Sequence, residues 1–251
     1  TAIMSSEISD DTLMALVKKH FNAVTFGNEL KPDALFNYQI GQSVDSTTIT
    51  FQGKELKVPV VNDKQENLDF SRADEMLDKI LEWNNANPND KIRVRGHVLV
   101  WHSQTPEWFF HEDYDVAKPY ADKETMNRRL EWFIFSVFDH YFGKAANGKY
   151  DGLFYGWDVV NEAVNDDGTM RTSSNWYKVY GDAGYVTDAF TFARKYADKD
   201  VKLFLNDYNE YAAAKRDRIY QVVKDLYDKG LCDGVGMQSH YSCLLYTSPS
   251  P

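Results

Sequence analysis

Apolar and polar residues follow two different spacings along this chain, one typical of β-strands and the other of α-helices. Short apolar runs that predict strands lie at residues 21–26, 91–101, 153–162, 201–207 and 234–240. Apolar residues at helical spacing occupy the stretches from Leu13 to Phe21, Ala73 to Leu81, Met126 to Tyr141, Val186 to Tyr196 and Ile219 to Leu226. Strands that take turns with helices predict an α/β fold built around a parallel sheet.

One helix start and one hairpin can be placed within this pattern. The segment Ser71-Arg72-Ala73-Asp74 has the spacing of a capping box, so we expect a helix to begin there. Residues 39–67 are mostly polar and break the alternation, with short strand-like patches at 48–51 and 57–61 on either side of a Gln-Gly-Lys turn. This stretch predicts an inserted hairpin rather than a strand of the main sheet.

The segment Gly156-Trp157-Asp158-Val159-Val160-Asn161-Glu162-Ala163 places an amide and a carboxyl at the end of a buried apolar strand. In parallel sheets, this end of the strand faces ligands. We expect the apolar residues of the strand to surround Glu162, and such surroundings favour the neutral carboxyl that a general acid needs. The alternative is that Asn161 and Glu162 cap a helix. The flanking strand favours a catalytic Glu162.

Polar side chains follow the other predicted strands at the same end. They are Asn28, Glu29 and Lys31; His97, Trp101, His102 and Gln104; Asn206, Asp207 and Asn209; and Gln238 and His240. Alternation along a strand places Gln238 and His240 on one face, and likewise His97 and Trp101. Amides and acids bind hydroxyl groups and an indole forms an apolar floor, so this mixture suits a hydroxyl-rich ligand. For any one of these residues, capping or core packing is a better explanation than contact with a ligand. Capping does not explain why five strands all end in such residues.

The composition narrows the class of partner. The chain has 251 residues, enough for one domain of the size of a (β/α)8 barrel, which runs to about 250 residues. A formal net charge of −10 at pH 7 disfavours nucleic acid and anionic membranes as partners, so a neutral ligand is favoured. Aromatic residues make up 15% of the chain, and their rings stack on sugar faces as well as filling cores.

A metal hydrolase and a membrane protein are both disfavoured. The two cysteines, Cys232 and Cys243, have no metal-ligand spacing and give no disulfide framework. The six histidines include no His-x-x-x-His pair, so we expect neither a metal nor a cofactor. No apolar run reaches the roughly 18 residues of a membrane span, and the first residues lack the charged and apolar regions of a signal peptide.

Five segments resemble motifs of the glycoside hydrolase family 10 endo-β-1,4-xylanases. They are residues 21–25 with Asn28-Glu29-Leu30-Lys31, residues 95–104 with Pro106 and Trp108, residues 157–163, residues 205–209 and residues 234–240. The resemblance covers roughly residues 1–241, apart from the hairpin region. It implies a (β/α)8 TIM barrel with its site on the top face. The barrel is expected to be incomplete, with about six of eight strands and a partial first strand.

The resemblance also implies hydrolysis of β-1,4-xylan with retention, by two carboxylates. Glu162 would be the acid/base, and Asn161 would bind the 2-hydroxyl of the sugar being cleaved. The other substrate-binding residues implied are Asn28, Glu29, Lys31, His97, Trp101 and Gln104, together with Gln238 and His240. The expected partners are xylan or xylo-oligosaccharides, bound by a monomer. A polymeric substrate implies a secreted or periplasmic protein.

The chain departs from the family pattern after Tyr241. The family's nucleophilic Glu lies on a seventh strand, whereas Glu210 is the last Glu here. Residues 242–251 have no carboxylate and end in a Ser-Pro repeat, so we expect a non-native, unstructured tail behind a partial catalytic domain at 1–241. Two hypotheses remain. Either the full-length protein is a retaining endo-1,4-β-xylanase and this chain an inactive copy of part of it, or the chain is a catalytically dead xylo-oligosaccharide-binding fragment.

Overall fold

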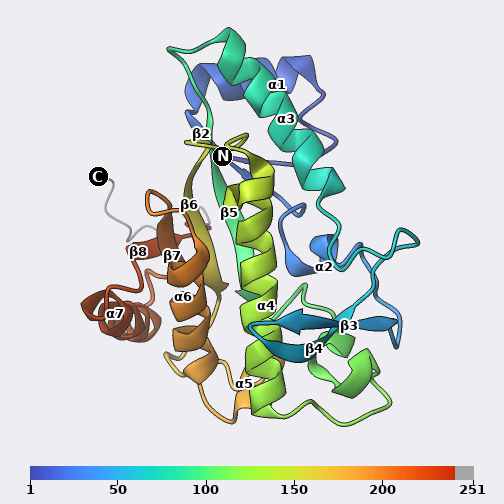
Figure 1. Ribbon diagram of the computed structural model, residues 1–251. Helices are drawn as coiled ribbons and strands as arrows, with labels where there is room; N and C mark the ends of the chain where they lie inside the picture. Colours follow the sequence, from blue (N-terminus) through green and yellow to red (C-terminus); the bar gives the residue numbers. More distant parts are fainter. Residues whose placement is uncertain (241–251) are drawn as a thin grey trace.

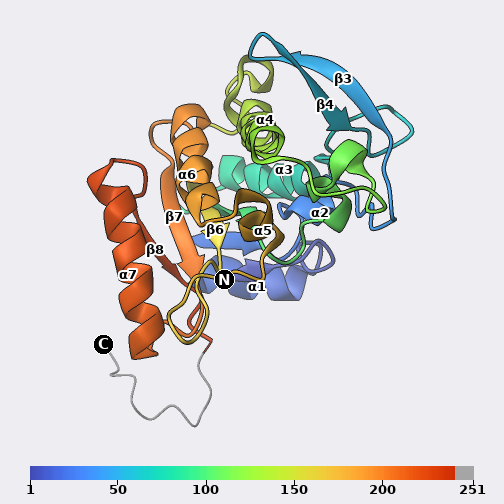
Figure 2. The same ribbon diagram turned by 90° about the horizontal axis from the view of Figure 1, so that it is seen from below.

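A computed structural model describes residues 1–240. The main element of the fold is a six-stranded parallel sheet (Figure 1). Its strands, in spatial order, are β1 (Ala2–Ile3), β2 (Ala23–Phe26), β5 (Arg93–Trp101), β6 (Phe154–Asn161), β7 (Lys202–Asp207) and β8 (Gly234–Met237). Every neighbouring pair is parallel. The sheet curls into a half-barrel, which confirms the predicted incomplete (β/α)8 fold (Figure 2).

Helices connect successive strands, and the long helices α3, α4, α6 and α7 lie outside the curl of the sheet (Figure 2). The α-helices are α1 (Asp11–His20), α2 (Pro32–Leu35), α3 (Ser71–Ala86), α4 (Lys123–Phe142), α5 (Asn175–Tyr180), α6 (Gly184–Tyr196) and α7 (Ala213–Asp228). Three short 3-10 helices are η1 (Glu107–Phe110), η2 (Glu112–Tyr114) and η3 (Lys144–Ala146). The parallel pairing of the strands requires these crossovers.

The first helix differs from its prediction in the residues that it buries. Asp10 caps α1 by accepting hydrogen bonds from the backbone N–H groups of the first turn. Met14 and Val17 are buried, whereas Leu16 and Phe21 are 53% and 47% exposed. The predicted apolar face was therefore wrong at Leu16 and Phe21. Leu16 lies about 100° around the helix from Val17, and Phe21 has already left the helix in an extended conformation.

Helix α3 begins at Ser71 as predicted, but not through a capping box. The carboxylate of Asp69 accepts hydrogen bonds from the backbone N–H and the hydroxyl of Ser71. Asp74, the expected partner in the box, instead contacts Nε2 of His140 on α4. The capping-box prediction was wrong because a carboxylate two residues before the helix already satisfies its first donors.

Residues 46–59 form the expected hairpin. Strand β3 (Ser46–Phe51) pairs with β4 (Lys54–Pro59) in an antiparallel sheet of its own. Gln52 and Gly53 make the turn with φ angles of 50° and 74°, and paired left-handed residues are typical of tight hairpins. The hydroxyl of Tyr114 donates to the backbone of Lys57. The hairpin is thereby attached to the loop that follows β5.

Aromatic side chains anchor α4 to the sheet. Trp157 of β6 is fully buried, with its ring centroid 5.2 Å from that of Phe138 and 5.9 Å from that of Tyr141. Gly96 of β5 lies against this indole, and a methyl group at Gly96 would overlap it. Since Trp157 points toward the helices, the adjacent Asp158 points to the concave face of the sheet.

The predicted boundary at Tyr241 and the predicted tail at 242–251 lie outside the described residues. No helix within residues 1–240 combines the length and the apolar character that a membrane span requires.

Candidate active site

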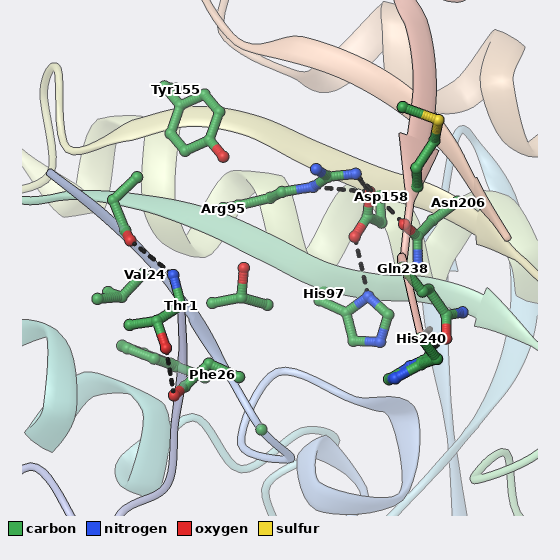
Figure 3. A pocket seen from close by; sticks show the side chains of 15 residues that line it. Thr1, Val24, Phe26, Arg95, His97, Tyr155, Asp158, Asn206, Gln238 and His240 are labelled. Carbon is green, nitrogen blue, oxygen red and sulfur yellow. Dashed lines mark hydrogen bonds and ion pairs between the residues drawn. The ribbon is translucent and has the colours of Figure 1, made fainter. Parts of the chain in front are cut away.

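Polar side chains gather on the concave face of the sheet and at the carboxyl ends of its strands (Figure 3). A cavity of about 470 Å³ runs along this face. Residues of β1 and β2 form one part of its wall, and Arg95, His97, Asp158, Asn206 and Gln238 contribute polar groups to the remainder. The half-barrel thus presents a polar hollow next to its rim.

Glu162 lies at this rim, surrounded by three N–H donors. Nε1 of Trp101 donates to Oε2 at 3.0 Å, and the side-chain amides of Asn161 and Gln238 donate to Oε1 at 3.1 and 2.9 Å. These four residues are called the acid cluster below. The Glu162 side chain is 13% exposed. The structure therefore brings together four predicted site residues from the ends of β5, β6 and β8.

The surroundings of the Glu162 carboxylate are more polar than the sequence predicted. Trp157 points away from it toward α4, and Glu162 itself has a left-handed φ of 56°. Its N–H donates to the backbone oxygen of Asn206 at 2.8 Å, and Nε of Arg171 donates to its carbonyl oxygen at 2.8 Å. Strand alternation does not continue through such a turn, so the side chain faces the polar rim rather than the apolar strand.

Gln238 and His240 follow β8 rather than lying on it. Strand β8 ends at Met237, and Ser239 has a left-handed φ of 53°. Gln238 reaches the acid cluster, whereas His240 is exposed and contacts Oε1 of Gln238 at 3.1 Å. The predicted strand was therefore too long, because it stops before both residues, although the two side chains contact each other and line the same cavity.

A second group of polar residues lies beside the acid cluster. It consists of Asn28, Lys31, Asp33 and Gln104 and is called the lysine cluster. Nζ of Lys31 donates to Oδ1 of Asn28 at 3.0 Å and to Oε1 of Gln104 at 2.8 Å. Nε2 of Gln104 donates to Asp33 at 3.0 Å. The same Lys31 nitrogen lies 5.0 Å from the ring centroid of Trp101, so the indole adjoins both clusters.

Burial shifts two charges within the lysine cluster. It lowers the pKa of Lys31, and the nearby carboxylates of Asp33, Glu162 and Glu29 oppose this shift. Burial also raises the pKa of Asp33, against the hydrogen bond from Gln104. Both shifts favour neutral forms, because the two groups lie partly out of water.

Glu29 was predicted to contact substrate, but its carboxylate is held by the backbone. Its two oxygens accept hydrogen bonds from the N–H groups of Ser5 at 2.8 Å and Asn28 at 3.1 Å. The residue is only 4% exposed. In this structure Glu29 fixes the backbone of Asn28, and a direct sugar contact by Glu29 stays a prediction.

An ion-paired group halfway along the strands of the concave face was not predicted from the sequence. Asp158 accepts a hydrogen bond from Nε of Arg95 at 2.9 Å and lies 2.9 Å from Nδ1 of His97 (Figure 3). His97 is thus oriented by Asp158 and not by the acid cluster. One signal in the sequence could have revealed this group. Asp158 is an acid inside a buried apolar strand, and a carboxylate in such a place requires a partner.

His102 adjoins the acid cluster from the loop after β5. Its Nε2 lies 3.9 Å from Oε2 of Glu162, and its Nδ1 is buried without a hydrogen-bond partner among the described residues. Burial lowers the pKa of His102, and the positive charge of Arg171 adds to the effect. The imidazole is therefore a neutral neighbour of the carboxylate near pH 7.

Among the described residues, the site holds the carboxylate of Glu162 among hydroxyl-binding groups, with the half-buried carboxylate of Asp33 in the neighbouring lysine cluster. Of the other acids near the strand ends, Asp158 pairs with Arg95, and Asp207 lies 3.0 Å from the ammonium group of Lys215. Glu210 is 8% exposed and accepts a hydrogen bond from Ser239. Within residues 1–240 no group of three His, Cys, Asp or Glu side chains could hold a metal ion. This arrangement suits proton transfer to a bound, hydroxyl-rich ligand.

Known proteins are similar to this chain in both sequence and fold. A putative endo-1,4-β-xylanase from Caldicellulosiruptor saccharolyticus is 54% identical over 59% of this chain and 46% of its own length. Endo-1,4-β-xylanase Y from Acetivibrio thermocellus is 37% identical over 96% of this chain and 21% of its own length. The chain thus spans less than half the length of these two relatives.

Solved structures agree with these relatives. The N-terminal endo-1,4-β-D-xylanase 10B of Clostridium thermocellum, complexed with xylohexaose, has a TM-score of 0.74 at 34% identity, over 95% of this chain and 43% of that one. TsXylA, an intracellular xylanase from Thermoanaerobacterium saccharolyticum, has a TM-score of 0.71 at 33% identity, over 96% of this chain and 63% of that one. The sequence model of glycosyl hydrolase family 10 matches residues 1–248. The chain belongs to glycosyl hydrolase family 10.

Proposed function

We propose that the protein containing this chain hydrolyses β-1,4-xylan with retention of configuration, and that Glu162 is its acid/base. One observation carries this proposal: the Glu162 carboxylate lies among the donors of Trp101, Asn161 and Gln238, at the rim of a polar hollow. Membership of a family whose relatives are named endo-1,4-β-xylanases supports the substrate class.

In the proposed reaction, Glu162 protonates the leaving oxygen and then activates the water that releases the product. Its three N–H donors fit the second step, in which the carboxylate accepts a proton. The lysine cluster and Trp101 would hold the sugar, with the amides and the ammonium group on its hydroxyls and the indole beneath its ring.

Retention also requires a second carboxylate, about 5–5.5 Å from the first. Asp158 and Asp207 are held in ion pairs, and Glu210 is buried against Ser239. We infer that none of these acids serves as the nucleophile, and that the 251-residue chain alone binds xylo-oligosaccharides without cleaving them. The preformed lysine cluster favours this second candidate function, which is sugar binding without cleavage. The cluster would bind sugar hydroxyls whether or not a second carboxylate is present.

We further infer that the protein acts outside the cytoplasm, because polymeric xylan does not cross membranes. The structural neighbour TsXylA is described as an intracellular xylanase, so the compartment needs a test of its own. Cell fractionation of the source organism tests the compartment, with hydrolysis of xylan and of short xylo-oligosaccharides compared in each fraction.

Azide rescue tests the role of Glu162 in a xylan-hydrolysing protein that contains this chain. Glu162→Ala should spare the first step for substrates with good leaving groups and block the second, because no base then activates water. Azide should restore turnover by replacing that water, whereas Asp225→Ala, on the exposed surface of α7, should leave activity unchanged. Equal losses on every substrate without rescue would contradict the role.

A further inference from the structure

A lysine of α7 is buried directly behind the rim. The side chains of Lys215 and Asp207 are both 0% exposed, and Nζ of Lys215 lies 3.0 Å from Oδ1 of Asp207. The same nitrogen lies 3.0 Å from Oδ1 of Asp166 and 3.4 Å from the ring centroid of Tyr208. The ammonium group is thus enclosed by two carboxylates and an aromatic face.

Neither helix formation nor burial explains why a lysine occupies this position. Lys215 lies in the first turn of α7, where a positive charge opposes the helix dipole. Burying an ion pair also removes two charges from water, and apolar residues of similar volume often stabilise a protein as well or better. Stability alone therefore does not account for the buried pair of Lys215 and Asp207, and we expect the pair to have a functional role.

Asp207 connects this pair to the segment that follows Glu162. Its Oδ2 accepts a hydrogen bond from the N–H of Val164 at 3.3 Å, and its Oδ1 accepts one from the N–H of Tyr208 at 2.9 Å. Val164 is two residues beyond Glu162, on the far side of the left-handed turn. One carboxylate therefore joins the end of β7 to the turn that presents the acid.

The end of β7 also contacts the near side of this turn. The backbone oxygen of Asn206 accepts the N–H of Glu162 at 2.8 Å. Arg171, which donates to the Glu162 carbonyl, also contacts the hydroxyl of Tyr208 at 3.3 Å. Residues 206–208 thus contact the turn at and after Glu162, and the contact through Asp207 is the one that a fully buried charge makes directly.

We propose that Lys215 is a positioning residue for Glu162: its charge keeps Asp207 ionised and directed at Val164, which fixes the turn that points Glu162 at the acid cluster. This inference rests on the proposed role of Glu162. Burial raises the pKa of Asp207, and the hydrogen bond and charge of Lys215 oppose that rise. Without Lys215, Asp207 would take up a proton or turn away, and the hold on Val164 would weaken.

Nuclear magnetic resonance of the 15N-labelled 251-residue chain tests this proposal without requiring turnover. The Trp101 indole N–H donates to Glu162, so its chemical shift reports where the carboxylate lies, and Glu162→Gln identifies the dependent signal. In Lys215→Met we expect this signal to move and the Val164 amide to exchange with solvent at least about tenfold faster. Lys224→Met is the matched control, because Lys224 pairs with Asp228 on the exposed side of the same helix.

A rescue variant separates positioning from general destabilisation. Asp207→Asn/Lys215→Met has no buried charge but keeps an oxygen that can accept the Val164 N–H, so both signals should return toward those of the unmodified chain. Asp207→Leu/Lys215→Met has no such oxygen and should keep the displaced indole signal and the fast exchange. These two double variants also decide the matter if Lys215→Met does not fold.

The proposal is overturned if Lys215→Met folds with both signals unchanged, or if the two double variants behave alike. Neither result bears on whether the protein hydrolyses xylan. Conversely, a failed azide rescue would remove the role of Glu162 while leaving the measured effect of Lys215 on the turn intact.

Discussion

Asn161 has its side-chain amide fixed in one orientation before any sugar is bound. Its Oδ1 accepts hydrogen bonds from Asn206 at 2.8 Å and Gln238 at 3.1 Å, while its Nδ2 donates to Glu162. An amide nitrogen has two hydrogens, so one remains for a ligand hydroxyl. A donor that is already oriented loses little entropy on binding.

Replacing Asn161 should therefore affect the chemical step more than binding. In a xylan-hydrolysing protein that contains this chain, we expect Asn161→Ala to lower kcat by about 100-fold and to change KM much less, because the bond strengthens as charge develops at the sugar. Steady-state kinetics on an aryl xylobioside would measure both constants. A change confined to KM would contradict the assignment.

At the residue scale, the sequence predicted groups that follow strands better than groups inside them. Glu162 and Trp101 could be found because each ends an apolar run. The pairing of Asp158 with Arg95 and His97 could not, since it depends on how β5 and β6 align, with His97 opposite Asp158. The burial of Glu29 was equally hidden, because its partner Ser5 lies in the loop after β1.

Among the elements, the hairpin is fastened to the barrel by charges at Asp113 of η2. Its carboxylate pairs with Lys118 and with Lys57 of β4. Hydrogen bonds from Lys118 and Lys57 lower the pKa of Asp113 to about 2. The folded state therefore binds a proton less readily than the unfolded chain, so this contribution to stability is present above the ordinary carboxyl pKa and is lost as the pH falls toward 2.

Asp113→Asn should consequently destabilise the chain only where the carboxylate is ionised. We expect a loss of less than about 1 kcal/mol near neutral pH, since the pair is exposed and screened, and a smaller loss at about pH 3. Urea unfolding at the two pH values measures the difference. In a Lys57→Met/Lys118→Met background the same substitution should have little effect at either pH, and a pH-independent loss would refute the explanation.

Helix α4 packs against the sheet through Trp157, and the indole ring occupies the space that a side chain at position 96 would fill. We expect Gly96→Ala to lower the free energy of unfolding by about 1–3 kcal/mol, because the added methyl group would overlap a buried indole held by its neighbours. Gly41→Ala is the control, since its methyl group would meet nothing nearer than 3.7 Å. Equal midpoints for the two variants in urea would show that the indole moves freely.

The spacing of apolar residues predicted which elements exist but not where each stops. Strand β8 ends at Met237 because the backbone turns left-handed at Ser239, and no apolar pattern marks such a turn. Leu16 fits the helical spacing and is nonetheless exposed, whereas Met14 and Val17 of the same helix are buried. Boundaries and exposed faces depend on neighbours that are distant in sequence.

For the whole molecule, the alternation of strands and helices predicted an α/β fold with a parallel sheet, and the family resemblance predicted the incomplete barrel. The pairing of the charged side chains could be seen only in the folded structure. Among the described acids near the rim, Glu162 is surrounded by three N–H donors and Asp33 is half-buried in the lysine cluster. Asp158, Asp207 and Glu210 are ion-paired or buried. This division bears directly on whether 251 residues suffice for catalysis.

We expect the purified 251-residue chain to release no reducing sugar from xylan above a Glu162→Gln control, because double displacement requires a second, free carboxylate. Weak affinity for xylo-oligosaccharides should remain and should fall in Trp101→Ala and Asn28→Ala. Reducing-sugar assays and calorimetry measure the two properties. Turnover that disappears in the control would mean that another acid acts as nucleophile, and Glu210 would be the first to replace.

The tryptophans of the chain differ sharply in their surroundings. Trp108, Trp132, Trp157 and Trp176 are at most 3% exposed, and Trp83 is half-buried, with Nζ of Lys18 4.1 Å from its ring centroid. Trp101 is partly exposed and bonded to Glu162. Indole fluorescence responds to polarity and to nearby proton acceptors. A sugar entering this site would therefore change the emission of one tryptophan against a constant background, which gives the chain an optical reporter without any added dye.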